Sequence, residues 1–322
     1  MRGKEEFERL IKIAQLYYEH HLSQEEIAQR IGISRSQISR LLKKAVDSGL
    51  IEIQVKILNP MADVLALSEK IQSQYGLREA IIVPIKNTSI QSVKRALGEA
   101  AARVLSREIK KSTSLGVSWG TTLRETPAFL RPIDTFKVKV IPLVGGFGQT
   151  AVDVHANEIA RRIAENLNGE WYPIYAPAFF KNPVLRSEME KDPEIHRVLN
   201  LAREVEIALV GIGAVNTDSI LVSASYLSTE EMEELKSKKA VGDIVGRFFD
   251  KNGKTLNIPE IDQRILGLTL DDLTKIPTVI AVAEGKNKLA AIKGALRTGI
   301  IDLLITDDET AQSILSGTLP ES

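Results

Sequence analysis

The feature that most constrains the fold of this 322-residue chain is the alternation, after residue 60, of short apolar runs with amphipathic helical segments. Apolar runs of strand length occur at 80–85, 115–118, 137–143, 207–210, 279–283 and 303–306. Helical periodicity occupies 63–75, 90–110, 156–167, 286–295 and 309–315. Strands that alternate with helices predict an α/β fold with a mainly parallel sheet and right-handed crossovers. Ligands of such sheets bind beyond the carboxyl ends of the strands.

The first 58 residues carry a different pattern, that of a helix-turn-helix. Residues 7–18 repeat apolar side chains at helical spacing, which predicts a first helix. Ser23 followed three residues later by Glu26 is a capping box, so a second helix is expected to begin there. Gly32 ends that helix and Ser34 can cap a third. Two helices therefore meet across a turn of about three residues, as they do in helix-turn-helix modules.

The expected third helix, from Arg35 to about Asp47, is basic on its outer positions. It carries four Lys or Arg residues and no acidic residue before Asp47. Such a helix can enter the major groove, where its first polar side chains reach base edges and its basic residues meet phosphates. The candidate DNA contacts are Ser34, Arg35, Ser36, Gln37, Ser39, Arg40, Lys43 and Lys44.

Within this set, Gln37 is the first candidate for reading adenine, and Arg35 for reading guanine or holding a phosphate. Arg40, Lys43 and Lys44 are expected to contact the DNA backbone, which supplies affinity without sequence information. The alternative is that the helices form a winged-helix module that binds another protein, with the charges as a solvated surface.

The end of the helical module is predicted from residues 49–57, which alternate apolar and polar side chains after a glycine and are typical of a strand or wing. Asn59-Pro60 then disfavours a continuing helix. We therefore expect a winged helix-turn-helix domain at 1–58 and a larger α/β domain at 59–322.

The composition excludes several classes of protein. The absence of cysteine removes disulfides, thiolate metal sites and cysteine nucleophiles, and it suits a reducing cytoplasm. The charged N-terminal segment has no signal-peptide pattern, and no window approaches the run of about 18 apolar residues that a membrane helix needs. Since 42 basic and 42 acidic residues cancel, DNA binding would depend on local charge.

The segment 115–122 has the composition of a phosphate-binding loop between a strand and a helix expected from Leu123. Glycine lets the backbone approach an anion, threonine hydroxyls donate hydrogen bonds, and the N–H groups at a helix start attract negative charge. The Gly-Lys-Ser/Thr ending of a nucleotide-binding P-loop is missing, which argues against ATP or GTP. An ordinary tight turn is the alternative. The candidate ligand residues here are Ser118, Gly120, Thr121 and Thr122.

Other segments that follow predicted strands are expected to complete the ligand site. A lysine at 288 could neutralise the same phosphate, and glycine pairs allow close backbone approach. Asp243 could accept hydrogen bonds from sugar hydroxyls, although a lone aspartate after glycine is more often a turn or a helix cap. The additional candidates are Gly145, Gly146, Gly211, Gly213, Asp243, Gly285 and Lys288.

No metal or cofactor is expected, because His155 and His196 are isolated and lack metal-ligand spacing. The candidate loops also show no evident catalytic pair, although Asp243 could serve as a base. A sugar-phosphate isomerase or deaminase with an added helical domain is the chief alternative to a non-enzymatic regulator. A non-catalytic adaptor that binds protein through its helical module is a third.

Taken together, these motifs resemble the SorC family of sugar-binding transcriptional regulators, which is sometimes grouped with DeoR-like proteins. The resemblance spans nearly the whole chain and rests on the order and spacing of its motifs. These are the helix-turn-helix at 23–50 and the segments 116–122, 143–146, 208–215, 240–250 and 283–288.

The resemblance implies a Rossmann-like effector domain, related to sugar-phosphate isomerases and deaminases, that binds a phosphorylated sugar and forms oligomers, often tetramers. It places Gly120, Thr121, Thr122 and Lys288 in a phosphate subsite and Asp243 near the sugar hydroxyls. The implied function is a homo-oligomeric regulator of carbohydrate-metabolism genes that binds operator DNA and is switched by the effector. The identity of the sugar phosphate, the operator and the direction of the response stay open.

Three positions depart from the family pattern. Glu284 stands where glycine is common, and Lys239 and Ser225 stand where glycine is frequent. A carboxylate at Glu284 would repel a phosphate if it pointed inward. Either the ligand differs from that of the relatives, or this side chain faces outward.

Overall fold

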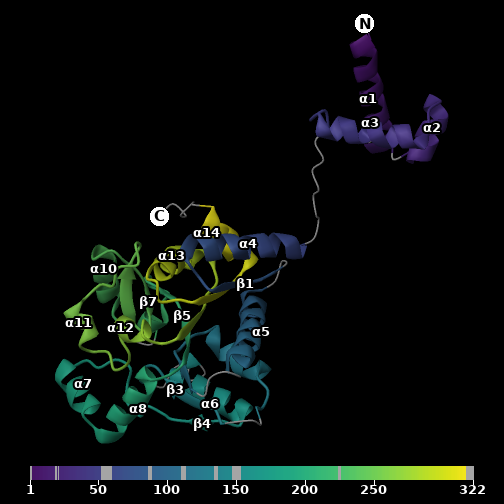
Figure 1. Ribbon diagram of the computed structural model, residues 1–322. Helices are drawn as coiled ribbons and strands as arrows, with labels where there is room; N and C mark the ends of the chain where they lie inside the picture. Colours follow the sequence, from purple (N-terminus) through teal and green to yellow (C-terminus); the bar gives the residue numbers. More distant parts are fainter. Residues whose placement is uncertain are drawn as a thin grey trace. The chain divides into compact units, whose positions relative to one another are not determined.

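The computed structural model describes residues 2–18, 20, 22–51, 60–85, 89–109, 114–133, 137–146, 154–223 and 226–316. The chain divides into two compact units, Met1–Leu58 and Asn59–Ser322 (Figure 1). The first unit is helical, and the second is built on a parallel sheet.

The N-terminal unit is the predicted helix-turn-helix. Its helices are α1 (Arg2–Tyr18), α2 (Gln24–Ile31) and α3 (Arg35–Asp47). The capping box is present, since the Ser23 N–H donates to Glu26 Oε2 over 2.8 Å and the Glu26 N–H donates to Ser23 Oγ over 3.3 Å. Gly32 ends α2 with φ of 74°, a left-handed conformation that glycine adopts without steric cost.

The first helix begins five residues earlier than its apolar pattern indicates, at Arg2 instead of Phe7. Of the wing predicted at 49–57, residues 52–57 lie outside the described residues, and Gly49 lies in a turn. The core of the unit is small, which makes each of its side chains important for stability. Ile13, Ile27 and Ile38 are fully buried, and Leu42 packs with them.

The larger unit contains a seven-stranded sheet in which every pairing is parallel, in the order β1-β10-β9-β5-β2-β3-β4. The mainly parallel sheet predicted from the sequence is therefore confirmed. Its strands are β1 (Glu79–Val83), β2 (Ser114–Val117), β3 (Lys139–Pro142), β4 (Glu170–Trp171), β5 (Ile207–Gly211), β9 (Thr278–Val282) and β10 (Leu303–Asp307).

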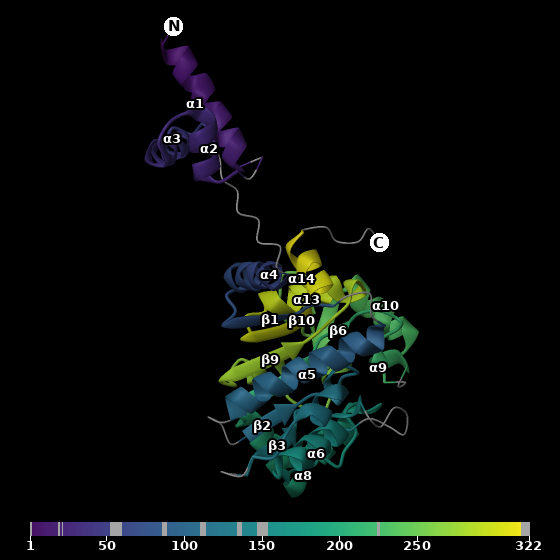
Figure 2. The same cartoon turned by 90° about the vertical axis from the view of Figure 1, so that its right-hand side faces the viewer.

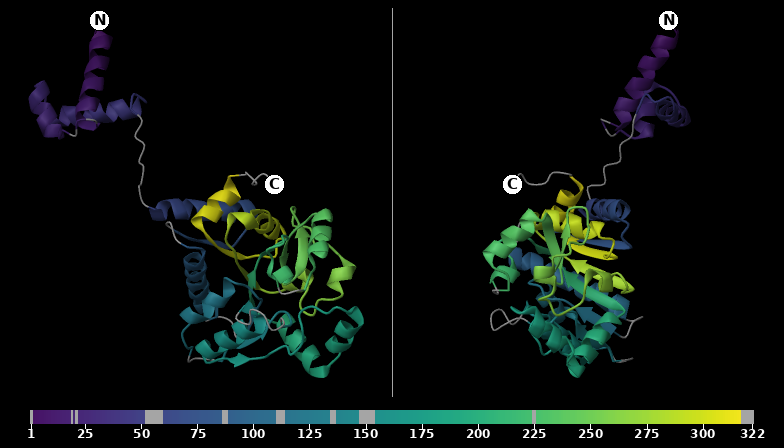
Figure 3. Two further views of the ribbon diagram at one scale, coloured as in Figure 1. Left: turned by 180° about the vertical axis from the view of Figure 1, so that it is seen from behind. Right: turned by 90° about the vertical axis from the view of Figure 1, so that its left-hand side faces the viewer.

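Helices cover both faces of this sheet. The described helices of this unit are α4 (Pro60–Tyr75), α5 (Ile90–Glu108), η2 (Leu123–Phe129), α6 (Ala156–Leu167), α7 (Pro183–Glu190), α8 (Pro193–Arg203), α9 (Ile220–Ser223), α10 (Thr229–Ser237), α11 (Pro259–Asp262), α12 (Leu270–Leu273), η4 (Lys286–Lys288), α13 (Leu289–Arg297) and α14 (Asp308–Leu315). Figure 2 shows α5 crossing one face of the sheet. The helices α4, α13 and α14 lie together in every view (Figure 3).

The burial of β9 on both faces explains why residues 279–282 are all apolar. Val279 and Ala281 pack into the core cluster that includes α4, α8 and α13, whereas Ile280 and Val282 pack into the cluster formed with α5 and α6. A strand buried on both faces needs no polar side, which is why such runs are continuous and not alternating.

A second, three-stranded antiparallel sheet was not predicted from the sequence. It consists of β6 (Gly213–Ala214), β7 (Ala240–Ile244) and β8 (Arg247–Asp250). In this sheet Gly213 lies opposite Asp243. The turn or helix cap considered for Asp243 is therefore wrong, because the residue lies within a strand.

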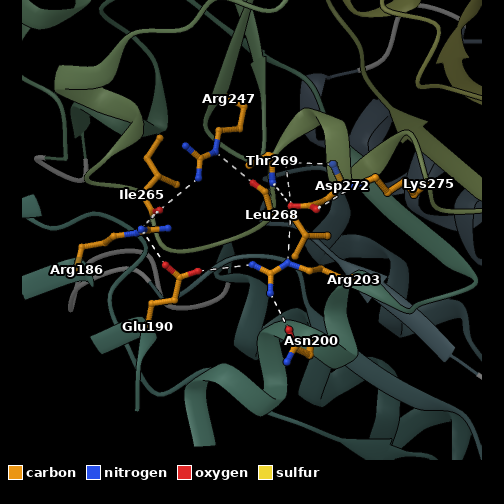
Figure 4. Close-up of polar contacts among 10 residues, drawn as sticks. All are labelled: Arg186, Glu190, Asn200, Arg203, Arg247, Ile265, Leu268, Thr269, Asp272 and Lys275. Atoms are coloured by element: carbon orange, nitrogen blue, oxygen red, sulfur yellow. Dashed lines mark hydrogen bonds and ion pairs between the residues drawn. The ribbon is translucent and has the colours of Figure 1, made fainter. Parts of the chain in front are cut away.

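An arginine network ties α7 and α8 to the segment around Ile265 (Figure 4). The Ile265 carbonyl accepts hydrogen bonds from Arg186 Nε, over 3.0 Å, and from Arg247 Nη2, over 3.3 Å. Glu190 pairs with Arg186 at 2.9 Å and with Arg203 at 3.6 Å. The buried Arg247 pairs with Asp262 at 3.3 Å, so the charges of this cluster are balanced within the fold.

Candidate DNA-binding helix and ligand cavity

Helix α3 has one buried side and one basic side. Ile38, Leu42 and Ala45 are buried at the spacing of one helical face. All eight residues predicted to contact DNA are exposed, as a helix that enters the major groove requires. The exposed positions place four basic side chains, Arg35, Arg40, Lys43 and Lys44, within 13 residues of one helix.

Ser34 caps α3 as predicted, but the sequence interpretation missed that Gln37 also takes part in the cap. They form a capping box, in which the Ser34 N–H donates to Gln37 Oε1 over 3.0 Å and the Gln37 N–H donates to Ser34 Oγ over 3.3 Å. Reading adenine takes both the oxygen and the nitrogen of a Gln side chain. Because the Gln37 oxygen accepts from the Ser34 N–H over 3.0 Å and from the Ser34 hydroxyl over 3.2 Å, both of its acceptor positions are used, and such a contact would have to open the cap.

A cavity of about 430 Å³ lies at the carboxyl ends of β2, β5 and β9. This is the edge at which ligands of open parallel sheets bind. The antiparallel sheet and the start of α5 contribute further walls through Asp243 and Lys94. The cavity brings together eight of the eleven predicted effector residues: Gly120, Thr121, Thr122, Gly211, Gly213, Asp243, Gly285 and Lys288.

Three predicted effector residues are not among the described residues that line the cavity. Ser118 is buried behind it, where its Oγ donates to the Trp119 carbonyl and accepts from the Gly211 N–H, each over 3.1 Å. Gly145 and Gly146 instead pack the chain against residues 176 and 177, and a Cβ at Gly145 would lie 2.6 Å from the Pro177 carbonyl oxygen. These two glycines are therefore not among the described residues that line the cavity, and a role for them in ligand binding stays a prediction.

The loop after β2 differs from the predicted strand-to-helix anion site. The segment from Leu123 is a 3-10 helix of seven residues that contains Pro127, and the Gly120 N–H already donates to the Val154 carbonyl over 3.2 Å. The α-helix start expected at this loop is therefore not formed. Side chains that line the cavity can supply charge for an anion.

Lys94 supplies such a charge and was missed in the sequence. It donates from Nζ to Thr121 Oγ1 over 3.0 Å at the cavity wall. Burial lowers the pKa of Lys94, and the nearby cations Lys288 and Arg124 act in the same direction, opposed by Glu284. Its position depends on close packing of α5 against η2, since a Cβ at Gly98 would lie 2.6 Å from the Cβ of Glu125.

Glu284 points inward. Its side chain lines the cavity, is only 3% exposed and accepts a hydrogen bond from Thr122 Oγ1 over 2.8 Å. Of the two alternatives left open by the sequence, the outward-facing side chain is therefore wrong. The predicted phosphate loop is in direct contact with a buried carboxylate.

Asp243 is the second buried carboxylate of the cavity, at 4% exposure. Burial raises its pKa from 3.8 to about 6, although the Gly246 N–H that donates to Oδ2 over 3.0 Å and the charge of Lys288 both act to lower it. A Cβ at position 213 would lie 2.0 Å from Asp243 Oδ1. Gly213 is therefore needed so that the carboxylate fits against β6.

The described residues contain no group of three or more His, Cys, Asp or Glu side chains that could hold a metal ion. In the same part of the chain, no helix is long and apolar enough to span a membrane.

Comparison with known proteins agrees with both halves of this description. Residues 59–316 match the family of sugar-binding domains called Sugar-bind, and residues 8–48 match sigma-70 region 4. The deoxyribonucleoside regulator of Bacillus subtilis strain 168 is 32% identical over 95% of this chain and 96% of its own. The transcriptional regulator LsrR of Enterobacter sp. strain 638 is 31% identical over 97% of this chain and 94% of its own.

A solved structure agrees over almost the same length. The full-length sorbitol operon regulator SorC of Klebsiella pneumoniae is 29% identical, with a TM-score of 0.75 over 96% of this chain and 98% of its own. The basic helix-turn-helix, the parallel sheet with a cavity at its carboxyl edge and these matches lead to one conclusion. The chain belongs to the SorC family of DeoR-type, sugar-binding transcriptional regulators.

Proposed function

We propose that this chain regulates carbohydrate-metabolism genes by binding operator DNA through α3, and that a phosphorylated sugar in the cavity changes its affinity for that DNA. One observation carries the proposal. The cavity gathers Lys94, Arg124 and Lys288 at the carboxyl edge of a parallel sheet, in a chain that also presents an exposed basic helix.

The cavity offers the two kinds of group that a sugar phosphate needs. Lys94 and Lys288 provide positive charge for the phosphate, and the Thr121 hydroxyl lies beside Lys94. Asp243 accepts hydrogen bonds, so it suits sugar hydroxyls. Charge-assisted hydrogen bonds to phosphate and carboxylate are about twice as strong as neutral ones, which would orient the ligand between the two lysines and Asp243.

Coupling to DNA requires that the sugar phosphate bind two arrangements of the protein with different affinity. A homo-oligomer, either a dimer or a tetramer, would provide those arrangements by changing the spacing of its recognition helices on two half-sites. Operator binding also places the protein with the chromosome, in the cytoplasm expected from the sequence. Light scattering of the full chain, with and without a sugar phosphate, measures its oligomeric state.

Measuring operator affinity tests the switch directly. DNA sites are first selected by the full chain from a random library, and fluorescence anisotropy then gives the Kd with each member of a panel of sugar phosphates. We expect at least one of them to change the Kd by about fivefold or more, the lower range of allosteric coupling. If no sugar phosphate changes the DNA affinity, the switch is refuted.

A pair of lysines provides a matched control. Lys288 lines the cavity, whereas Lys286, two residues earlier, is exposed and lies 3.7 Å from Glu309. Lys288→Gln is expected to weaken the response to the sugar phosphate, and Lys286→Gln to leave it unchanged. Equal effects of the two substitutions would show that the response depends on net charge and not on the cavity.

One observation favours an enzyme as the second candidate. Asp243 is buried in the cavity with a pKa of about 6, a value suited to general acid-base catalysis. Against it, the described residues that line the cavity include no histidine to act as a partner. NMR of sugar phosphates incubated with the full chain separates the two functions: turnover that Asp243→Asn abolishes supports the enzyme, and unchanged ligands support the regulator.

A further inference from the structure

Glu284 gives the cavity a buried negative charge beside Thr122. The sequence had predicted that a phosphate would contact this threonine. It follows β9 by two residues, at the carboxyl edge of the sheet. Its carboxylate is almost fully buried, lines the cavity and accepts the hydrogen bond from Thr122 Oγ1. Burial of a charge is unfavourable unless opposite charge is near. Lys94 and Lys288 line the same cavity, and the Glu284 carboxylate acts to raise the pKa of Lys94 against the effect of burial.

The two adjacent threonines of the loop consequently offer a ligand opposite hydrogen-bonding groups, one a donor and the other an acceptor. A hydroxyl has one proton, and Thr122 donates its proton to the Glu284 carboxylate, so toward a ligand Thr122 can only accept. Thr121 Oγ1 accepts from the Lys94 ammonium, and among the described residues the Thr121 hydroxyl donates to no acceptor, so its proton is available to a ligand anion.

The cavity therefore has two chemically distinct ends along one loop. Thr121 with Lys94 forms a donor end, which favours phosphate. Thr122 with Glu284 forms an acceptor end, which favours hydroxyl or ammonium groups and disfavours a second anion. A carboxylate can accept about four hydrogen bonds, and the structure occupies one position with Thr122, so acceptor capacity remains for a ligand.

We propose that Glu284 determines the ligand class, selecting sugar monophosphates with hydroxyl or ammonium donors at the acceptor end and rejecting sugar bisphosphates. This inference rests on the proposed function, because it assumes that a sugar phosphate enters the cavity. It assigns a positioning and specificity role to a side chain that a glycine at the same place could not fulfil.

The test compares two related ligands on the full chain by isothermal titration calorimetry. Fructose 6-phosphate and fructose 1,6-bisphosphate share a sugar and differ by one phosphate. We expect wild type to bind the monophosphate about tenfold or more tightly than the bisphosphate, since like charges a few ångströms apart in a partly buried site repel strongly. A preference of wild type for the bisphosphate, or no binding of either ligand, overturns the proposal without any variant.

Glu284→Gln removes the charge and keeps the shape. We expect it to bring the two affinities to within about threefold of each other, because the repulsion of the second phosphate is lost. Glu309→Gln removes one exposed carboxylate outside the cavity lining. It should keep the wild-type ratio of the monophosphate and bisphosphate affinities. An unchanged ratio in Glu284→Gln means that Glu284 serves only as the internal partner of Thr122 and Lys94, and the proposal fails.

Glucosamine 6-phosphate tests the acceptor end with an ammonium group. We expect it to bind wild type more tightly than glucose 6-phosphate, and the advantage to disappear in Glu284→Gln. No DNA is present in these measurements. A chain that binds sugar phosphates with this selectivity but shows no effect on DNA affinity would refute the proposed switch and still support the role of Glu284.

Discussion

Asp243→Asn should change how the stability of the larger unit depends on pH. The pKa of the buried Asp243 carboxyl is about 6 in the folded chain, against an ordinary value of 3.8. Because each pKa unit corresponds to about 1.4 kcal/mol, the charged form is disfavoured in the folded state by about 3 kcal/mol. Asparagine keeps the shape of the side chain and cannot ionise.

The direction in which stability changes with pH follows from proton binding. Between about pH 4 and pH 6 the folded state binds more protons at Asp243 than the unfolded state, so the free energy of unfolding of wild type falls as the pH rises through this window. This contribution is absent in Asp243→Asn. The stability of the variant relative to wild type should therefore increase by about 2 kcal/mol between pH 4 and pH 7, the rest of the roughly 3 kcal/mol lying outside this range.

Tryptophan fluorescence during urea unfolding measures the stability of the larger structural unit, because both tryptophans of the chain, Trp119 and Trp171, lie beyond residue 58. Asp271→Asn is the control, since it makes the same chemical change at an exposed position. If the difference in unfolding free energy between Asp243→Asn and wild type stays constant from pH 4 to pH 7, the argument that burial penalises this carboxylate is refuted.

Three other substitutions test separate parts of the structure. Gly213→Ala should destabilise the larger unit by about 1–3 kcal/mol and weaken sugar-phosphate binding, because its Cβ would meet the Asp243 carboxylate; urea unfolding and calorimetry measure both effects. Ile38→Ala should cost about 2–5 kcal/mol and abolish DNA binding while sugar-phosphate binding persists; full DNA affinity in this variant would contradict the small-core interpretation. Lys43→Ala should reduce the slope of log K against log salt by about one; an unchanged slope would mean that Lys43 meets no phosphate.

Much of the fold follows from signals that are local in the chain. Capping boxes at Ser23 and Ser34 start α2 and α3, and both are formed by residues three apart. The Ser34-x-x-Gln37 pattern was present in the sequence and would have revealed the structural role of Gln37. The order of short apolar runs and helices similarly determined a parallel sheet, since that order leaves few other ways to bury the strands.

The ligand cavity was only partly predictable. The sequence correctly placed at the cavity the glycine and threonines after β2 and Lys288 after β9. It could do so because the carboxyl ends of parallel strands share one edge of the sheet. Lys94 was missed because nothing near it in the sequence distinguishes it from the other polar positions of α5. Gly145 and Gly146 do not line the described cavity but pack the chain against residues 176 and 177, and a glycine required by chain packing has the same sequence signal as one required by a ligand.

The sequence by itself determined the elements, their order and the polarity of each helix face, because these depend on neighbours a few residues away. Only the tertiary structure decided the direction of Glu284, the burial of Asp243 and the contact between Lys94 and Thr121. Thr122 and Glu284 are separated by 162 positions in the chain. Side chains so far apart in sequence meet only after the strands have paired, so their contacts are a property of the fold.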